Sequence, residues 1–317
     1  MQKTDENSHF LHTFSQNTAK IQSSNSPDYP YLLKHIDNPP QSLYYMGDLG
    51  AVSAGFNLAV VGSRKMTGYG RLAAEFIISG FQGMPITVVS GLALGTDAWA
   101  HECALKAGLK TVAVLGSGLD RETMYPRANR GLAEKILSAG GLMLSEYPDG
   151  APALKQNFPA RNRIISGISR AVLIIEADYK SGALITAKHA WEQNREIYAV
   201  PGNINSKLSQ GANNCIFINK AMLARSAEDI ITQYEELTAA AKKARKTGKP
   251  GGFSPLQKKI IAAISENSAG GSADFDEILA ACKINPERLN AEISMLILSG
   301  AISVSENGRY GPSLTKH

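Results

Sequence analysis

Short apolar runs alternate with longer amphipathic stretches through the middle of the chain. The runs predict strands at Leu58–Val61, Ile86–Ser90, Thr111–Leu115, Leu142–Ser145, Ala171–Ile175 and Glu196–Val200. The stretches between them predict helices at Gly68–Phe81, Thr96–Ala107, Asn129–Ala139, Arg163–Ser169 and Ala183–Asn194. Strands and helices that alternate in this way form parallel βαβ units. The pattern therefore predicts an α/β fold built on a doubly wound, mostly parallel sheet.

The two ends of the chain lack this alternation. Residues 1–27 are rich in Ser, Asn, Gln and Thr, and we expect a disordered polar tail there. The main domain is expected over 28–238, ending in a predicted helix at Ala221–Thr238. Residues 253–317 predict three helices and a short hairpin, the order of a winged-helix domain, which serves either DNA binding or protein docking. The third of these helices, Glu287–Ser299, carries one Arg and two Glu, which favours docking.

The positive charge of the chain is concentrated in one segment. The formal net charge is +5, and Ala240–Gly251 contains five Lys or Arg residues and no acid. The rest of the chain is therefore balanced. We interpret 239–252 as a basic linker between the two domains, with contact to phosphates as the alternative interpretation.

Composition indicates a cytoplasmic protein that needs no cofactor. No segment has the ~20 apolar residues of a membrane span, and the N-terminus has no signal-peptide h-region. The three cysteines, Cys103, Cys215 and Cys282, have no metal-ligand or disulfide spacing, which fits a reducing compartment. Gly68–Ala73 matches G-x-G-x-x-A but lies beyond the strand-to-helix turn and lacks a ribose-binding acid, and a P-loop motif is absent.

Candidate binding residues lie in loops that follow the predicted strands. In a doubly wound sheet, ligands bind outside the carboxyl ends of the strands, and glycine turns that open onto helices bind anions. Gly62, Ser63 and Arg64 follow the first strand, and Ser181 and Gly182 open a helix flanked by Lys180 and Lys188. We expect these turns to contact phosphates.

A second candidate stretch precedes the strand at Ala171–Ile175. A predicted polar loop contains, within a span of nine residues, Lys155, Phe158, Arg161 and Arg163. Cations around an aromatic residue suit a phosphodiester chain whose bases are free to stack. The alternative is a solvated basic loop with Phe158 packed in the core.

Acidic residues near the same edge allow a catalytic interpretation. Asp97 and His101 are four residues apart on one helix and could form an acid/base pair. The alternative is that Asp97 or Thr96 caps the helix and that His101 is an ordinary, partly buried histidine. Glu146 and Glu176 each follow a strand. They either form ion pairs with the Arg161 and Arg163 loop or serve a nucleotide hydrolase or phosphoribohydrolase.

A longer series of motifs resembles the DNA-processing protein A (DprA/Smf) family. The matching segments are Ala59–Arg64, Val89–Gly95, Ala98–His101, Val114–Asp120, Tyr125–Pro126, Ser145–Tyr147, Phe158–Ser166, Glu176–Ala177, Ser181–Gly182 and Val200–Asn203. The resemblance covers roughly residues 28–312. It implies an extended Rossmann-like domain without catalytic activity, a C-terminal winged helix, and DNA binding in a positive pocket matched here by Gly62–Arg64, Lys155, Phe158 and Arg161–Asn162–Arg163.

The resemblance also implies partners. Proteins of this family bind single-stranded DNA, and double-stranded DNA more weakly, form homodimers through the Rossmann-like domain, and load the RecA recombinase in natural transformation. Two departures are visible. A short polar tail stands where many relatives carry an N-terminal helical domain, and Thr96 stands where the family usually has Ile.

Three hypotheses follow. In the first, the chain is a single-strand binding protein that protects incoming DNA and transfers it to RecA. In the second, it is an enzyme acting on nucleotides through Glu146 or Glu176. In the third, the winged helix is the main DNA reader, so that removal of residues 250–317 abolishes binding.

Overall fold

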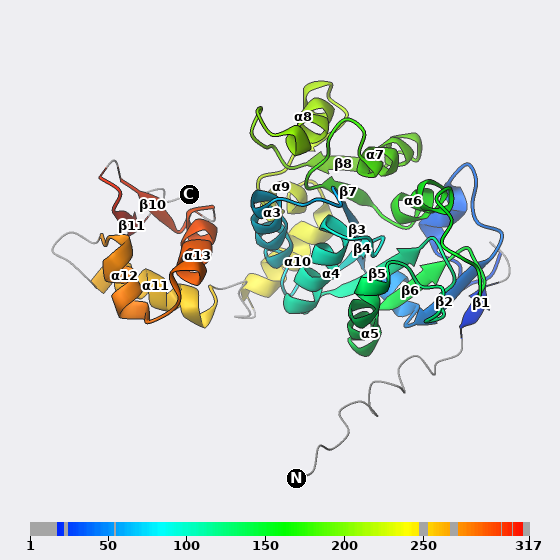
Figure 1. Cartoon of the computed structure of the whole chain (residues 1–317), viewed down its shortest axis with the longest axis horizontal. Helices are drawn as coiled ribbons and strands as arrows, with labels where there is room; N and C mark the ends of the chain where they lie inside the picture. Colours follow the sequence, from blue (N-terminus) through cyan, green and yellow to red (C-terminus); the bar gives the residue numbers. More distant parts are fainter. Residues whose placement is uncertain are drawn as a thin grey trace, which may run out of the picture. The chain divides into compact units, whose positions relative to one another are not determined.

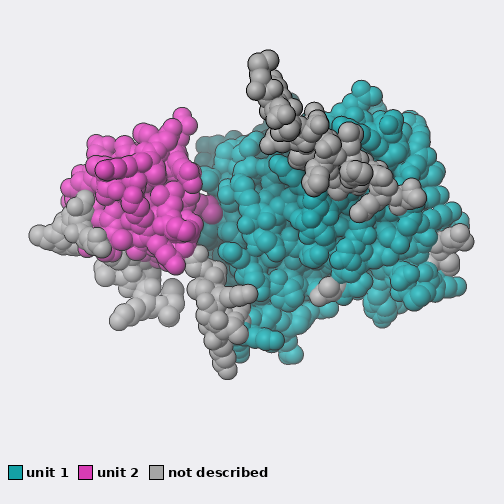
Figure 2. Space-filling view, turned by 90° about the horizontal axis from the view of Figure 1, so that it is seen from below, with its two compact units in different colours: residues 1–248 teal, residues 249–317 magenta. Residues whose placement is uncertain are grey.

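The computed structural model describes residues 18–21, 25–53, 55–246, 253–266, 272–298, 300–305 and 307–312 (Figure 1). The chain divides into two compact units, Met1–Gly248 and Lys249–His317, which are coloured separately in Figure 2.

A nine-stranded sheet forms the centre of the first unit (Figure 1). In spatial order its strands are β1 (Ala19–Ile21), β2 (Leu43–Gly47), β6 (Leu142–Ser145), β5 (Lys110–Leu115), β4 (Ile86–Ser90), β3 (Phe56–Val61), β7 (Ala171–Ile174), β8 (Glu196–Ala199) and β9 (Met222–Leu223). Neighbours from β6 to β9 pair in parallel, whereas β2 pairs antiparallel with both β1 and β6. The predicted α/β fold with a mostly parallel sheet is confirmed.

Strand β3 lies at the point where the direction of winding changes. The chain adds β4, β5 and β6 on one side of β3, and then returns to add β7, β8 and β9 on the other. All six residues of β3 are buried. Alternate side chains enter opposite cores: Ala59 and Val61 pack in one, and Leu58 and Val60 in the other. Such a strand reads as a continuous apolar run because helices cover both faces of the sheet.

The helices form two layers, one over each face of the sheet. Core residues on one face come from α2 (Gly50–Ser53), α6 (Asn157–Gly167), α7 (Gly182–Glu192) and α8 (Gln210–Phe217). Those on the other face come from α3 (Gly68–Ser79), α4 (Thr96–Lys106), α5 (Arg130–Ser138), α9 (Ala227–Ile231) and α10 (Glu235–Lys246).

Three predicted segments differ in the structure. Ala19–Ile21, assigned to the disordered tail, form β1 because Ile21 packs into the core beside β2. The single helix predicted at Ala221–Thr238 is instead β9, α9 and the start of α10. Residues 239–246 of the predicted linker are helical, since α10 is rich in alanine and has acids in its first turn. Residues 1–17 and 247–252 lie outside the described part of the chain.

The prediction of a polar loop up to Arg163 is also wrong, because the helix α6 already begins at Asn157. Pro159 is the third helical residue, a position where its missing N–H is not needed. Asn157 and Arg161 lie one turn apart on the buried face, followed by Ile164 and Ile165. Two polar residues on the buried face conceal the apolar periodicity from which a helix is normally recognised.

The second unit contains the helices and hairpin in the predicted order. They are α11 (Pro255–Glu266), α12 (Phe275–Cys282), α13 (Pro286–Leu298), β10 (Ile302–Val304) and β11 (Tyr310–Pro312). Ile260, Ile264, Leu289, Ile293 and Leu296 pack together as its core.

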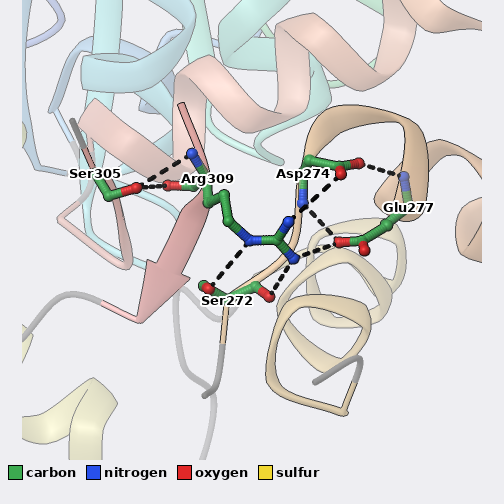
Figure 3. Close-up of polar contacts among 5 residues, drawn as sticks. All are labelled: Ser272, Asp274, Glu277, Ser305 and Arg309. Carbon is green, nitrogen blue, oxygen red and sulfur yellow. Dashed lines mark hydrogen bonds and ion pairs between the residues drawn. The ribbon is translucent and has the colours of Figure 1, made fainter. Parts of the chain in front are cut away.

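The hairpin of the second unit is bound to α12 by Arg309 (Figure 3). The guanidinium contacts Glu277 at 2.7 Å and Asp274 at 3.5 Å, and it donates to the carbonyl of Ser272 at 3.1 Å. Asp274 is the N-cap of α12 and forms a capping box with Glu277. Arg309, next to the hairpin turn, is therefore paired with two carboxylates. This pairing disfavours a contact between Arg309 and a phosphate.

Candidate nucleic-acid interface

A cavity of about 810 Å³ opens at the carboxyl edge of the main sheet, and we call it the rim cavity. The loops after β3 and β7 meet the first turns of α6 and α7 there. This is the switch point of the winding, where doubly wound sheets hold their ligands. Most predicted site residues line it, namely Gly62, Ser63, Arg64, Lys155, Phe158, Arg161, Asn162, Ser181 and Gly182.

Two predicted cations lie outside the lining of the rim cavity. Arg163 forms a bidentate pair with Glu146, at 2.7 and 2.9 Å, and donates to the carbonyl of Asn38 at 3.0 Å. Lys188 lies on α7, where it is exposed and 3.7 Å from Glu192. The predicted ion pair of Glu146 is therefore present, and it withdraws Arg163 from the cavity.

Gly62 permits a close approach between two loops. A Cβ at Gly62 would lie 2.5 Å from Oγ1 of Thr96, and both the N–H and the hydroxyl of Thr96 donate to the carbonyl of Ser63 at 3.1 Å. Gly95, with φ +79°, would meet the same carbonyl at 2.4 Å. Thr96, the departure from the family pattern, thus contributes a hydrogen bond that an Ile could not make.

Arg161 is a buried cation at the inner wall of the cavity. Its residue is 3% exposed, and its Nη1 donates to the carbonyl of Gly91 at 2.8 Å and to that of Val114. Burial lowers its pKa to about 10, although the charge of Asp97 acts in the opposite direction. Arg161 is therefore charged at neutral pH, but its guanidinium joins the ends of β4 and β5.

Asp97 and His101 are both buried around this arginine. Burial raises the pKa of Asp97, against the charge of Arg161 and hydrogen bonds from the N–H groups of Ala93 and Gly91. Burial and the charge of Arg161 lower the pKa of His101 to about 3, and its Nδ1 lies 2.7 Å from Oγ1 of Thr111. Gly95 is the N-cap of α4, so neither Asp97 nor Thr96 caps the helix, contrary to one of the two interpretations of the sequence. Asp97 orders the loop after β4.

The accessible positive charge of the rim cavity comes from Arg64, Lys65 and Lys155, which are all exposed, and one partly exposed carboxylate, Asp178, also lines the cavity. Within the described residues none of the three cations has an ion pair. The guanidinium of Arg64 lies 5.5 Å from the ring centroid of Phe158. Phe158 is half-buried, and the centroid of its ring lies 5.7 Å from the ring centroid of Tyr125, which also lines the cavity. Sequence reasoning missed Lys65 and Tyr125, although Lys65 directly follows Arg64.

The first turn of α7 adds backbone donors to the cavity. Ser181 is the N-cap and accepts from the N–H of Ala183 at 3.3 Å, while Asn162 donates to the carbonyl of Gly182 at 3.3 Å. A Cβ at Gly182 would meet no atom within 4 Å. The N-terminus of a helix of this length favours anions through its free N–H groups and its dipole.

Glu176 contacts the β3–α3 loop at Thr67 and does not line the rim cavity. It accepts hydrogen bonds from the N–H of Thr67 at 2.9 Å and from its hydroxyl at 2.5 Å. Glu176 lines a second cavity, of about 570 Å³, together with Thr67 and Tyr69. The predicted ion pair to Arg161 or Arg163 is therefore replaced by a bond to the N-cap of α3.

The described residues contain no cluster of three or more His, Cys, Asp or Glu side chains placed to hold a metal ion. Among the helices of the described ranges, none combines the length and the apolar character that a membrane crossing requires.

Comparisons with known proteins give consistent matches. A family model described as DNA recombination-mediator protein A matches residues 20–235. Protein Smf of Synechocystis sp. is 36% identical over an alignment of 338 positions, gaps included, that covers 95% of this chain and 82% of that protein. DNA processing protein DprA of Streptococcus pneumoniae is 42% identical over 207 residues, covering 65% of this chain and 71% of that protein.

Two solved structures share the fold. DNA processing protein A of Streptococcus pneumoniae superposes with a TM-score of 0.64 at 38% identity, over 73% of this chain and 79% of that one. DNA processing protein A of Helicobacter pylori, described for its single-stranded DNA binding mode, gives a TM-score of 0.62 at 27% identity, over 70% of this chain and 97% of that one.

Proposed function

Because this chain belongs to the DNA recombination-mediator protein A (DprA/Smf) family, we propose that it binds single-stranded DNA in the rim cavity. The observation that carries the proposal is the convergence of Arg64, Lys65 and Lys155 around Phe158 at the switch point of the sheet. These cations neutralise phosphates, and Phe158 stacks on a base. The single-stranded DNA binding mode described for the Helicobacter pylori relative supports the same ligand class.

The architecture of the cavity favours single over double strands. An aromatic ring beside phosphate-binding cations can stack only on a base that has left its partner. A duplex offers the cations its phosphates but keeps its bases paired. Double-stranded DNA therefore binds more weakly, mainly through charge.

The family name supports a role after binding. The chain protects incoming single strands and loads them onto the RecA recombinase during natural transformation, in the cytoplasm. This activity requires binding without turnover, so we propose no catalytic residue. Glu146 is held by Arg163, and Glu176 by Thr67, which gives each carboxylate a structural partner.

The chain acts as a homodimer through the first unit. Large apolar side chains are exposed near β9, the last strand of the sheet: Trp191 at 52%, Phe217 at 85%, Ile218 at 45% and Leu223 at 42%. We call this set the β9 patch. Such a patch beside an open strand edge is typical of a contact surface.

A titration with labelled oligo(dT) tests the proposal. The wild type is compared with Arg64→Ala and Lys155→Ala, and Lys188→Ala is the matched control because Lys188 is exposed but lies outside the rim cavity. We expect affinity to fall steeply with salt, and each cavity variant to reduce the slope of log K against log salt by ~0.7. Affinity that is flat with salt, or an equal loss in Lys188→Ala, contradicts the proposal.

A parallel assay separates binding from catalysis. The protein is incubated with nucleoside monophosphates, and free base is measured. Release of base by the wild type, and its loss in Glu176→Gln, favours the hydrolase hypothesis instead.

A further inference from the structure

Tyr125 presents a second aromatic ring to the rim cavity. Tyr125 is 47% exposed and reaches the cavity from the connection between β5 and α5, whereas Phe158 comes from α6. The two ring centroids are 5.7 Å apart, with the planes at 58°. The two rings therefore do not present one continuous face, and each can take its own base.

The loop that carries Tyr125 is fixed on both sides. Met124, the preceding residue, is 1% exposed and packs in the core beneath α5. Burial works against the ionisation of Asp120, but hydrogen bonds from Thr123 and from the N–H of Gly150 hold its pKa below the ordinary value. Asn129 donates to the carbonyl of Leu92 at 2.7 Å and joins this loop to the loop after β4. Tyr125 is thus a preorganised side chain on a braced loop, which limits the entropy lost on binding.

The two aromatic positions differ in their surroundings. Phe158 is packed against Gly116, whose Cβ would lie 3.2 Å from the ring, and the guanidinium of Arg64 lies 5.5 Å from the ring centroid. The hydroxyl of Tyr125 has no hydrogen-bond partner among the described residues, and its ring has no cation over it there. Tyr125 therefore combines a partly exposed ring, which adjoins Phe158 in a tilted arrangement, with a hydroxyl group that can donate to a base edge or a phosphate.

We propose that Tyr125 forms a second base-stacking subsite, which binds the nucleobase next to the one on Phe158. This inference rests on the proposed function of the rim cavity and adds to it the number of bases held. The cavity volume, about 810 Å³, leaves room for more than one nucleotide, since pockets of ~300–1,000 Å³ enclose whole drug-sized ligands. Every base has a π-face, so the subsite accepts any unpaired base.

Abasic substitution tests the subsite. A single abasic site is moved along a labelled oligo(dT), and affinities are measured for the wild type, Tyr125→Ala, Tyr125→Phe and Phe158→Ala. Tyr31→Ala is the control, because Tyr31 is 73% exposed and does not line the cavity. In the wild type we expect two adjacent positions at which loss of the base lowers affinity, each by about ten-fold.

The variants then assign each position to a ring. Tyr125→Ala lowers affinity by about ten-fold and removes one sensitive position, Phe158→Ala removes the other, and Tyr125→Phe keeps both. The inference is overturned if Tyr125→Ala leaves both positions sensitive, or if it behaves like Tyr31→Ala. The proposed function fails separately, if oligo(dT) does not bind or binds without dependence on salt.

Discussion

The arginines of the rim cavity have different physical roles, although all were candidates for phosphate binding. Arg64 is exposed and lies over Phe158, whereas Arg161 is buried and donates to two backbone carbonyls. An exposed cation can be removed with little effect on folding. A buried cation balances the charge of Asp97 and satisfies carbonyls that have no access to water, so its removal leaves unpaired polar groups.

Arg161→Ala should therefore lower the free energy of unfolding by ~2–6 kcal/mol, because it leaves two buried carbonyls without a donor and each such group costs ~1–3 kcal/mol. Arg64→Ala should change it by less than ~0.5 kcal/mol. Urea denaturation monitored by circular dichroism gives both values, and oligo(dT) affinity is measured on the same samples. If Arg161→Ala unfolds like the wild type but binds DNA as poorly as Arg64→Ala, Arg161 contacts the DNA instead.

His101 makes stability depend on pH. Its pKa is about 3 in the folded chain, against 6.5 for an ordinary histidine, so the unfolded state binds one more proton between these values. Its contribution to stability is complete above pH ~6.5 and is lost as the pH falls toward 3, with a slope of ~1.4 kcal/mol per pH unit. The raised pKa of Asp97 acts in the opposite direction, so the difference between wild type and His101→Asn is the informative quantity. Unfolding midpoints from pH 7 to about pH 4 should converge for the two proteins; parallel curves would contradict the assignment.

At the scale of elements, the strands that could be predicted from the sequence are those whose two faces are both buried. The strands β3, β4, β5, β6, β7 and β8 are buried on both faces and appear as apolar runs. Only the second half of α6 was predicted, as a helix at Arg163–Ser169; its first half was missed because the buried face there carries Asn157 and Arg161, whose hydrogen-bond partners lie in distant segments. Tyr125 could not be placed in the cavity, since only the folded chain brings its loop beside Phe158.

The junction between β3 and α3 gives a prediction at this scale. Thr67 is the N-cap of α3, accepts from the N–H of Gly70 at 3.0 Å, and donates to Glu176 after β7. Thr67→Ala removes the cap and one partner of a buried carboxylate, which should cost ~1–2 kcal/mol in the free energy of unfolding. Thr67→Ser keeps the hydroxyl and should restore most of that loss. Equal urea midpoints for wild type and Thr67→Ala would show that the cap contributes nothing.

At the scale of the whole molecule, the proposed dimer depends on the β9 patch. Phe217 is 85% exposed at the end of α8, an exposure that a free apolar side chain maintains only at a cost in water. Phe217→Asp places a charge in the proposed contact, where it must be desolvated against apolar side chains. Sedimentation velocity should give twice the 33.9 kDa chain mass for the wild type and the chain mass for Phe217→Asp. Tyr31→Asp, a control at another exposed aromatic residue, should remain dimeric.

The rim cavity lies at the carboxyl edge of the sheet and includes no residue of the β9 patch. The Phe217→Asp monomer should therefore still bind a short oligo(dT). A Phe217→Asp protein that stays dimeric moves the contact to another face of the first unit.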